Sequence, residues 1–389
     1  MLNSITDAIT NSFNMFWEIM WALILGFSVS AAIQAVVSKS GMARLLPDDS
    51  PRTLAVSTLL GAASSSCSYA SVAIARSMFR KGADFTAAIV FEFASTNLVI
   101  ELGVIMALLL GWQFTLAEFI GGPVMIVVLA LLFRIFLKRW MAERARERAN
   151  RGLVGRMEGH AAMDMSVSGG TLLQRLLSKK GFTSTSRYFV MDWASLLRDI
   201  ILGLLIAGAL AAWVPNSFWQ SLFLSQSGFA AKIWGPLIGP LVSLVSFVCS
   251  IGNVPLAVIL WDGGISFGGV ISFIFADLII LPILDIYRKY YGIRMSAFLL
   301  ATSYAAMATA GYVLEAVFGA LGLIPARRNL QAVFASVSFN YTTVLNIVFL
   351  VAAAAMLVRF FSTGGLAMLR MMNVSEDEMT QMSGMADMK

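Results

Sequence analysis

Two cysteines, Cys67 and Cys249, are the only thiols in this chain of 389 residues, and each is followed directly by a serine. A thiolate is a soft ligand for Cu(I), Zn²⁺ and other thiophilic centres. A trivalent arsenical that carries one organic group has two exchangeable positions, which two thiols can fill. Free cysteine is also a common small core residue, so simple packing is the alternative interpretation.

The surroundings of the two cysteines repeat along the chain. The stretch 67–98 aligns with the stretch 249–280 without a gap, and ten of the aligned positions are identical. The matches include the paired Cys-Ser and the glycines Gly82 and Gly264. We interpret this match as an internal duplication. Duplicated segments that are interrupted at matching positions are typical of transporter binding sites.

Hydroxyl and amide side chains lie close to both cysteines in the sequence and would make a pocket between the repeats more polar. A pseudo-two-fold axis between the repeats would bring both thiols near one central site. The predicted substrate-binding residues are Cys67, Cys249, Ser66, Ser68, Ser250, Asn253 and Asn97.

Two acidic residues, Glu92 and Asp277, lie inside apolar segments. A charged side chain at the centre of a membrane helix costs roughly 2.5–3.5 kcal/mol on insertion scales, so each acid should face a cavity or a partner. We predict that Asp277 and Glu92 couple transport to proton exchange. The alternative is a protonated structural acid that bonds to a nearby hydroxyl. Glu101 and Asp285 are nearer to helix ends, and we expect them at the membrane interface.

The elements that position these residues must be membrane helices. The chain is 58% hydrophobic and 13% charged, whereas soluble domains are about 25% charged. A run of about 20 apolar residues spans a bilayer as a helix. The nine predicted segments are 16–37, 53–79, 85–110, 114–137, 193–213, 236–260, 265–286, 296–324 and 333–361. The aromatic-rich segment 215–233 is expected to lie along the membrane interface.

Other functional classes lack support in the sequence. There is one histidine, His160, and no Walker A motif, so we expect neither an enzyme nor a cofactor. The net charge of +6 is concentrated in residues 138–191, which contain 11 Lys/Arg against four Asp/Glu. Apolar segments flank this region, so it is interpreted as a cytoplasmic loop and not as a nucleic-acid site.

Two of the nine segments, 53–79 and 236–260, contain small residues or Gly-Pro pairs and are predicted to be broken or re-entrant. If neither crosses the membrane, the short basic loops fall on the same side as the large one, as the positive-inside rule requires. We therefore predict an all-α polytopic membrane protein with 7–9 spans and two inverted repeats, each with a broken or re-entrant cysteine-containing helix. The predicted regions are a first transmembrane repeat (1–137), a basic cytoplasmic loop (138–191), a second repeat (192–324), a final transmembrane helix (325–361) and a cytoplasmic Met-rich tail (362–389).

The two Cys-Ser segments resemble those of the ArsP-type predicted permease family. The resemblance rests on Gly61-Ala-Ala-Ser-Ser-Ser-Cys67-Ser, on Phe93-Ala-Ser-Thr-Asn97, and on the second copy, Cys249-Ser-Ile-Gly-Asn-Val-Pro255. It covers roughly residues 15–361. The resemblance implies a bacterial inner-membrane permease; characterised relatives export trivalent organoarsenicals, and others are linked to copper or zinc efflux. Many relatives carry Cys-Ser-Cys or Cys-Cys in the first motif, where this chain has one thiol.

The sequence thus predicts a multi-pass permease of the bacterial inner (plasma) membrane. It would export a thiophilic metalloid or metal species by alternating access, with proton coupling as a hypothesis. Two alternatives stay open: a permease for an unrelated small solute with structural cysteines, and a non-transporting membrane subunit of a larger assembly. The expected partners are membrane lipid and a small-molecule or metalloid substrate, with no nucleic acid. The sequence does not determine whether a metal ion binds or whether the protein forms a homo-oligomer.

Overall fold

The computed structural model describes residues 2–36, 45–64, 68–150, 165–167, 171–225, 228–246, 250–325 and 341–371. Within these ranges every regular element is helical. The elements are α1 (Leu2–Val36), α3 (Pro51–Ser64), α4 (Ser68–Arg80), α5 (Phe85–Asn97), α6 (Ile100–Leu109), α7 (Trp112–Phe136), α8 (Arg139–Ala149), α10 (Leu172–Leu177), α11 (Lys179–Trp213), α12 (Asn216–Leu222), α13 (Phe229–Ser246), α14 (Ser250–Asp262), α15 (Phe267–Phe275), the 3-10 turn η1 (Ala276–Leu278), α16 (Leu281–Tyr291), α17 (Ile293–Ala320), α18 (Tyr341–Ser362) and α19 (Gly365–Met371).

The lengths and compositions of the helices confirm a polytopic membrane protein. Among the described residues, six helical segments are long and apolar enough to cross a membrane, and seven if the bent pair formed by α15–η1 and α16 counts as one. Large apolar side chains on these helices face outward, as Ile135 of α7 (70% exposed) and Val358 of α18 (69% exposed) illustrate. Outward apolar surface on long helices suits contact with lipid tails.

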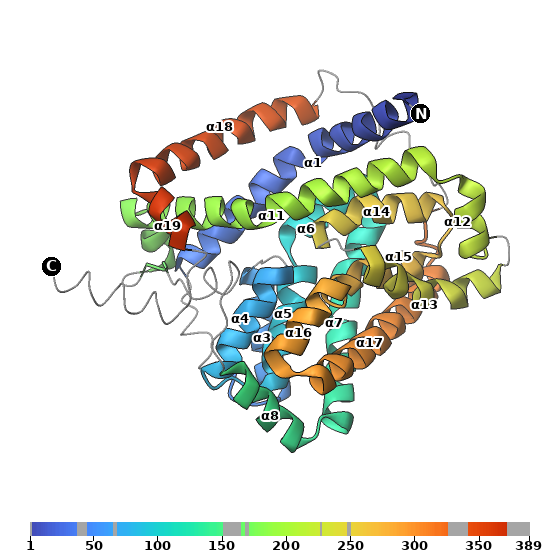
Figure 1. Ribbon diagram of the computed structural model, residues 1–389, viewed down its shortest axis with the longest axis horizontal. Helices are drawn as coiled ribbons and strands as arrows, with labels where there is room; N and C mark the ends of the chain where they lie inside the picture. The colour runs from blue at the N-terminus through green and yellow to red at the C-terminus, as the bar shows by residue number, and fades with distance from the viewer. Residues whose placement is uncertain are drawn as a thin grey trace.

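Three long helices, α1, α11 and α18, run side by side along the upper part of Figure 1, and the other spans pack below them. Asn346 ties α18 to α1, because its side chain accepts from the backbone N–H of Trp21 at 2.8 Å and donates to the carbonyl of Trp17 at 2.8 Å. Buried amides commonly join membrane helices in this way. Helix α11 begins at Lys179, inside the region expected to be a loop.

The segment 236–260 was predicted to be broken or re-entrant, partly because of its two Gly-Pro pairs, but the structure shows no break at these pairs. Helix α13 runs without a break through Pro236 and Pro240. Proline removes a backbone N–H and loosens the surrounding turns. Two tyrosines of α17 donate to carbonyls three residues before these prolines: Tyr304 to that of Leu237 at 2.9 Å, and Tyr312 to that of Ile233 at 2.6 Å. The predicted interfacial segment is likewise divided, since α12 covers only part of it and α13 already begins at Phe229.

The predicted segment 265–286 is a bent pair of helices in the structure and not one continuous helix. The chain leaves α15 through the turn η1 and enters α16 at a bend of 41°. Pro282 lies in the first turn of α16, where the fixed φ of proline favours the start of a helix. The bend places Asp277 in a break of the helix.

Two parts of the chain have the same local geometry at the spacing of the sequence repeat. Helices α4 and α14 end at equivalent positions of the repeat, Arg80 and Asp262. Each is followed by a glycine at positive φ, Gly82 at 109° and Gly264 at 102°. Side chains of Asp84 and Ser266 then cap α5 and α15. Positive φ favours glycine because it has no Cβ, so the two glycines have the same structural role.

Close helix packing gives a first prediction. Alanine at Gly311 of α17 should lower the free energy of unfolding by about 1–3 kcal/mol, because its Cβ would lie 2.6 Å from the carbonyl oxygen of Gly268. Gly319 of the same helix is the control, since a Cβ there meets only Ile324, at 3.7 Å. Alanine at Gly319 should raise stability by up to about 1 kcal/mol through helix propensity. Thermal unfolding of the purified variants measures the difference, and equal stability would contradict the close approach.

Candidate functional site

Two serines, one from each of the repeated Cys-Ser pairs, meet at one carboxyl group in the interior of the protein. Ser68 lies on α4 and Ser250 on α14. Both hydroxyls donate to Oδ2 of Asp277 at 2.6 Å, and the two hydroxyl oxygens are 3.3 Å apart. All three side chains are buried. We call these three residues the Ser-Ser-Asp centre.

The Ser-Ser-Asp centre lies where several helices end. Asn97, the last residue of α5, donates from Nδ2 to Oδ1 of Asp277 at 3.4 Å. Freed backbone and a carboxyl group at membrane depth are typical of binding sites in membrane transporters.

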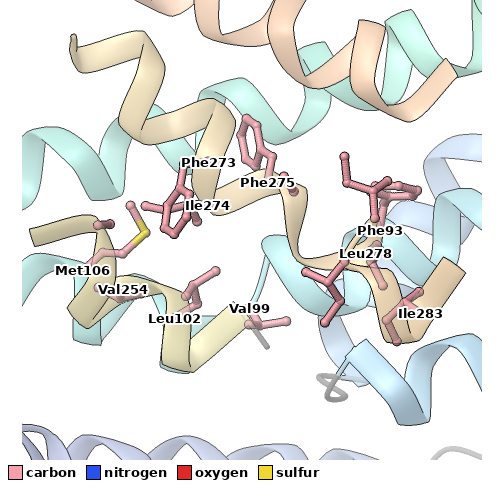
Figure 2. Packing of buried hydrophobic residues seen from close by; sticks show 14 of the residues in the cluster. Phe93, Val99, Leu102, Met106, Val254, Phe273, Ile274, Phe275, Leu278 and Ile283 are labelled. Atoms are coloured by element: carbon pink, nitrogen blue, oxygen red, sulfur yellow. The ribbon is translucent and has the colours of Figure 1, made fainter. Parts of the chain in front are cut away.

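Apolar side chains enclose the bend that carries Asp277. Phe93, Leu278 and Ile283 gather around the turn between α15 and α16 (Figure 2), and all three are fully or almost fully buried. An environment of this kind has a low dielectric constant, which strengthens each hydrogen bond and raises the penalty for a polar group without a partner.

Glu92 lies on α5 and is paired with a tyrosine of α16. The hydroxyl of Tyr287 donates to Oε1 of Glu92 in a short hydrogen bond, and both side chains are buried. Among the described residues, Oε2 of Glu92 has no hydrogen-bond partner. Glu92 also interacts electrostatically with Asp277, so the two predicted coupling acids occupy one connected region.

The structure brings only some of the predicted substrate-binding residues to this centre. Ser68, Ser250 and Asn97 contact Asp277. Asn253 does not; it donates to Ser243 at 3.3 Å and accepts from Ser246 at 3.4 Å, and thus ties α14 to α13. Three of the predicted residues lie outside the described part of the chain: Ser66, Cys67 and Cys249.

The sequence analysis missed a third buried acid, Glu118 of α7. Its side chain is 0% exposed, and among the described residues neither carboxyl oxygen has a hydrogen-bond partner. Glu118 also interacts electrostatically with Asp277. Its position inside the apolar segment 114–137 was the available signal. Glu101, in the first turn of α6, is 5% exposed and packs directly against Gly26 of α1; its predicted place at the membrane interface stays a prediction.

The described residues can thus bind a solute or a proton through hydroxyl, amide and carboxyl groups. Within them there is no group of three or more His, Cys, Asp or Glu side chains that could hold a metal ion. Serine hydroxyls both donate and accept, so the Ser-Ser-Asp centre is able to stabilise either protonation state of Asp277.

Comparison with known proteins identifies the family. A "Putative permease Rv2963" of Mycobacterium tuberculosis (strain ATCC 25618 / H37Rv) is 63% identical over 343 residues, which covers 88% of this chain and 84% of that protein. No solved structure matches the chain. The family model for ArsP_1, described as "Predicted permease", matches residues 4–316. The chain therefore belongs to the ArsP_1 family of predicted permeases.

Proposed function

We propose that this permease moves a small thiophilic solute, such as a trivalent organoarsenical or a soft metal ion, out of the cell across the bacterial inner membrane. The observation that carries the proposal is the meeting of Ser68 and Ser250 at Asp277. Each serine directly follows a cysteine in the chain. We propose Cys67 and Cys249, the chain neighbours of these serines, as the soft ligands of the solute.

We further propose that the chain contains two inverted repeats that rock against each other around this centre. The equivalent last residues of α4 and α14, Arg80 and Asp262, support the duplication, as do the paired glycines that follow these helices. Duplicated segments around a central site are typical of transporters that work by alternating access.

The thiol site is tested by transport into proteoliposomes that contain the purified full chain. We expect uptake of a methylated trivalent arsenical, with arsenite, Cu(I) and Zn²⁺ as comparison solutes. Replacing both Cys67 and Cys249 by serine should abolish that uptake, because hydroxyls do not replace thiolates at a soft centre. Unchanged uptake by the double variant would mean that the cysteines only pack. No uptake of any solute by the wild type would instead favour a non-transporting subunit.

Proton coupling is a separate part of the proposal and rests on Asp277 and Glu92. Both acids are buried within apolar surroundings, where a proton can be exchanged only through a hydrogen-bonded partner. We expect that the double variant Asp277→Asn with Glu92→Gln loses the stimulation of transport by an imposed pH gradient. A variant that transports at the wild-type rate with the same dependence on the gradient would contradict this role.

A further inference from the structure

A basic pocket of about 330 Å³ lies at one end of the helix bundle, apart from the Ser-Ser-Asp centre. Helix α8 forms one wall, and the junction between α16 and α17 forms the other. The charged residues that line it are Arg144, Arg148 and Arg294. No acidic residue lines the pocket, so its field attracts anions.

The three arginines are available for a ligand. Among the described residues none of them forms an ion pair, whereas Arg139 of the same helix α8 pairs with Glu143 at 3.3 Å. A guanidinium group presents several N–H donors in a fixed plane, a geometry that matches a phosphate group. Three such groups around one pocket therefore favour a phosphate-bearing ligand.

Two of the arginines already contact neighbouring groups of the protein. The guanidinium of Arg148 lies against the backbone of Gly292, where a Cβ would be 2.7 Å from Nη1. The guanidinium of Arg144 lies 5.2 Å from the centroid of the Trp140 ring, in a cation–π contact. A side chain that is already positioned loses less conformational entropy when it binds a ligand.

The position of the pocket in the fold indicates where the phosphate comes from. Span α7 ends at Phe136, shortly before α8 begins at Arg139, and span α17 begins at Ile293 in the pocket wall. The pocket thus lies at the level where membrane spans end. Ile293 (64% exposed) and Trp140 (41% exposed) add apolar surface beside the arginines, as suits the boundary between headgroups and acyl chains.

We propose that this pocket binds the phosphate of an anionic phospholipid headgroup from the adjacent leaflet. Basic pockets between membrane helices are known sites for such headgroups. The bound lipid would contact α8 and the start of α17 together. This inference does not depend on the transported solute, because it uses residues outside the Ser-Ser-Asp centre.

The test is lipid binding to the purified full chain, measured by native mass spectrometry while phosphatidylglycerol is titrated. Phosphatidylcholine and inorganic phosphate serve as the comparison ligands. We expect phosphatidylglycerol to bind, and each of Arg144→Gln, Arg148→Gln and Arg294→Gln to weaken it about fivefold. The control Arg139→Gln removes a charge from α8 outside the pocket and should leave the affinity unchanged.

Three results would overturn the proposal. If Arg139→Gln weakened phosphatidylglycerol binding as much as the pocket variants do, binding would depend on the general surface charge and not on the pocket. Equal binding of phosphatidylcholine would mean that an anionic headgroup is not recognised. Displacement of phosphatidylglycerol by inorganic phosphate at similar concentration would mean that the pocket takes a soluble anion.

Discussion

Replacing Asp277 by alanine is expected to abolish transport and to lower the free energy of unfolding by about 1–3 kcal/mol, the cost of one buried polar group without a partner. The hydroxyls of Ser68 and Ser250 both donate to the carboxyl group and are buried. Alanine removes their shared acceptor and leaves a space in the interior. Transport into proteoliposomes and unfolding of the purified protein, followed by tryptophan fluorescence, measure the two effects.

Two further variants separate the stability of the protein from its function. Asp277→Asn keeps the shape of the side chain and one acceptor oxygen, so it should fold with a much smaller loss of stability and transport at a rate that an imposed pH gradient no longer stimulates. Asp285→Asn is the surface control. Asp285 pairs with Arg288 and Lys289 on α16 at 44% exposure, where an ion pair contributes at most about 1 kcal/mol. If Asp277→Ala were as stable as Asp285→Asn, the Ser-Ser-Asp centre would not hold these helices together.

Replacing Glu118 by leucine is expected to raise the free energy of unfolding by about 1–3 kcal/mol, the usual penalty for a buried polar group without a partner. Among the described residues both carboxyl oxygens of Glu118 lack a hydrogen bond, and the side chain is 0% exposed. Leucine fills a similar volume without a polar group. We expect the same variant to transport more slowly, because ionisable residues inside membranes are commonly retained for function at a cost in stability.

Glu92 provides the matched comparison for Glu118. Both acids are fully buried and both interact electrostatically with Asp277. Glu92, however, accepts a hydrogen bond from Tyr287. Glu92→Leu should therefore destabilise the protein, because it leaves the buried tyrosine hydroxyl without an acceptor. The two leucine variants are thus expected to change stability in opposite directions. Loss of stability in Glu118→Leu would show that Glu118 has a partner.

Much of the local structure was predictable, because the hydropathy of a segment alone indicates whether it can form a membrane helix. The long apolar helices α7 and α17 lie close to their predicted bounds. The predicted interruption of segment 53–79 stays a prediction, since residues 65–67, between α3 and α4, lie outside the described part. The prolines of α13 misled the prediction, since Tyr304 and Tyr312 donate to carbonyls of that helix from a distant part of the chain.

By itself, the sequence determined that this is a helical membrane protein of a permease family and that its Cys-Ser pair occurs twice, because composition, apolar length and repetition are properties of the chain alone. Only the tertiary structure decided that Ser68, Ser250 and Asp277 share one centre, since these contacts join residues as far as 209 positions apart. It likewise decided that Glu92 has a tyrosine partner, whereas the described residues offer Glu118 none. Such pairings depend on which helix faces pack together, and no local pattern of residues encodes that choice.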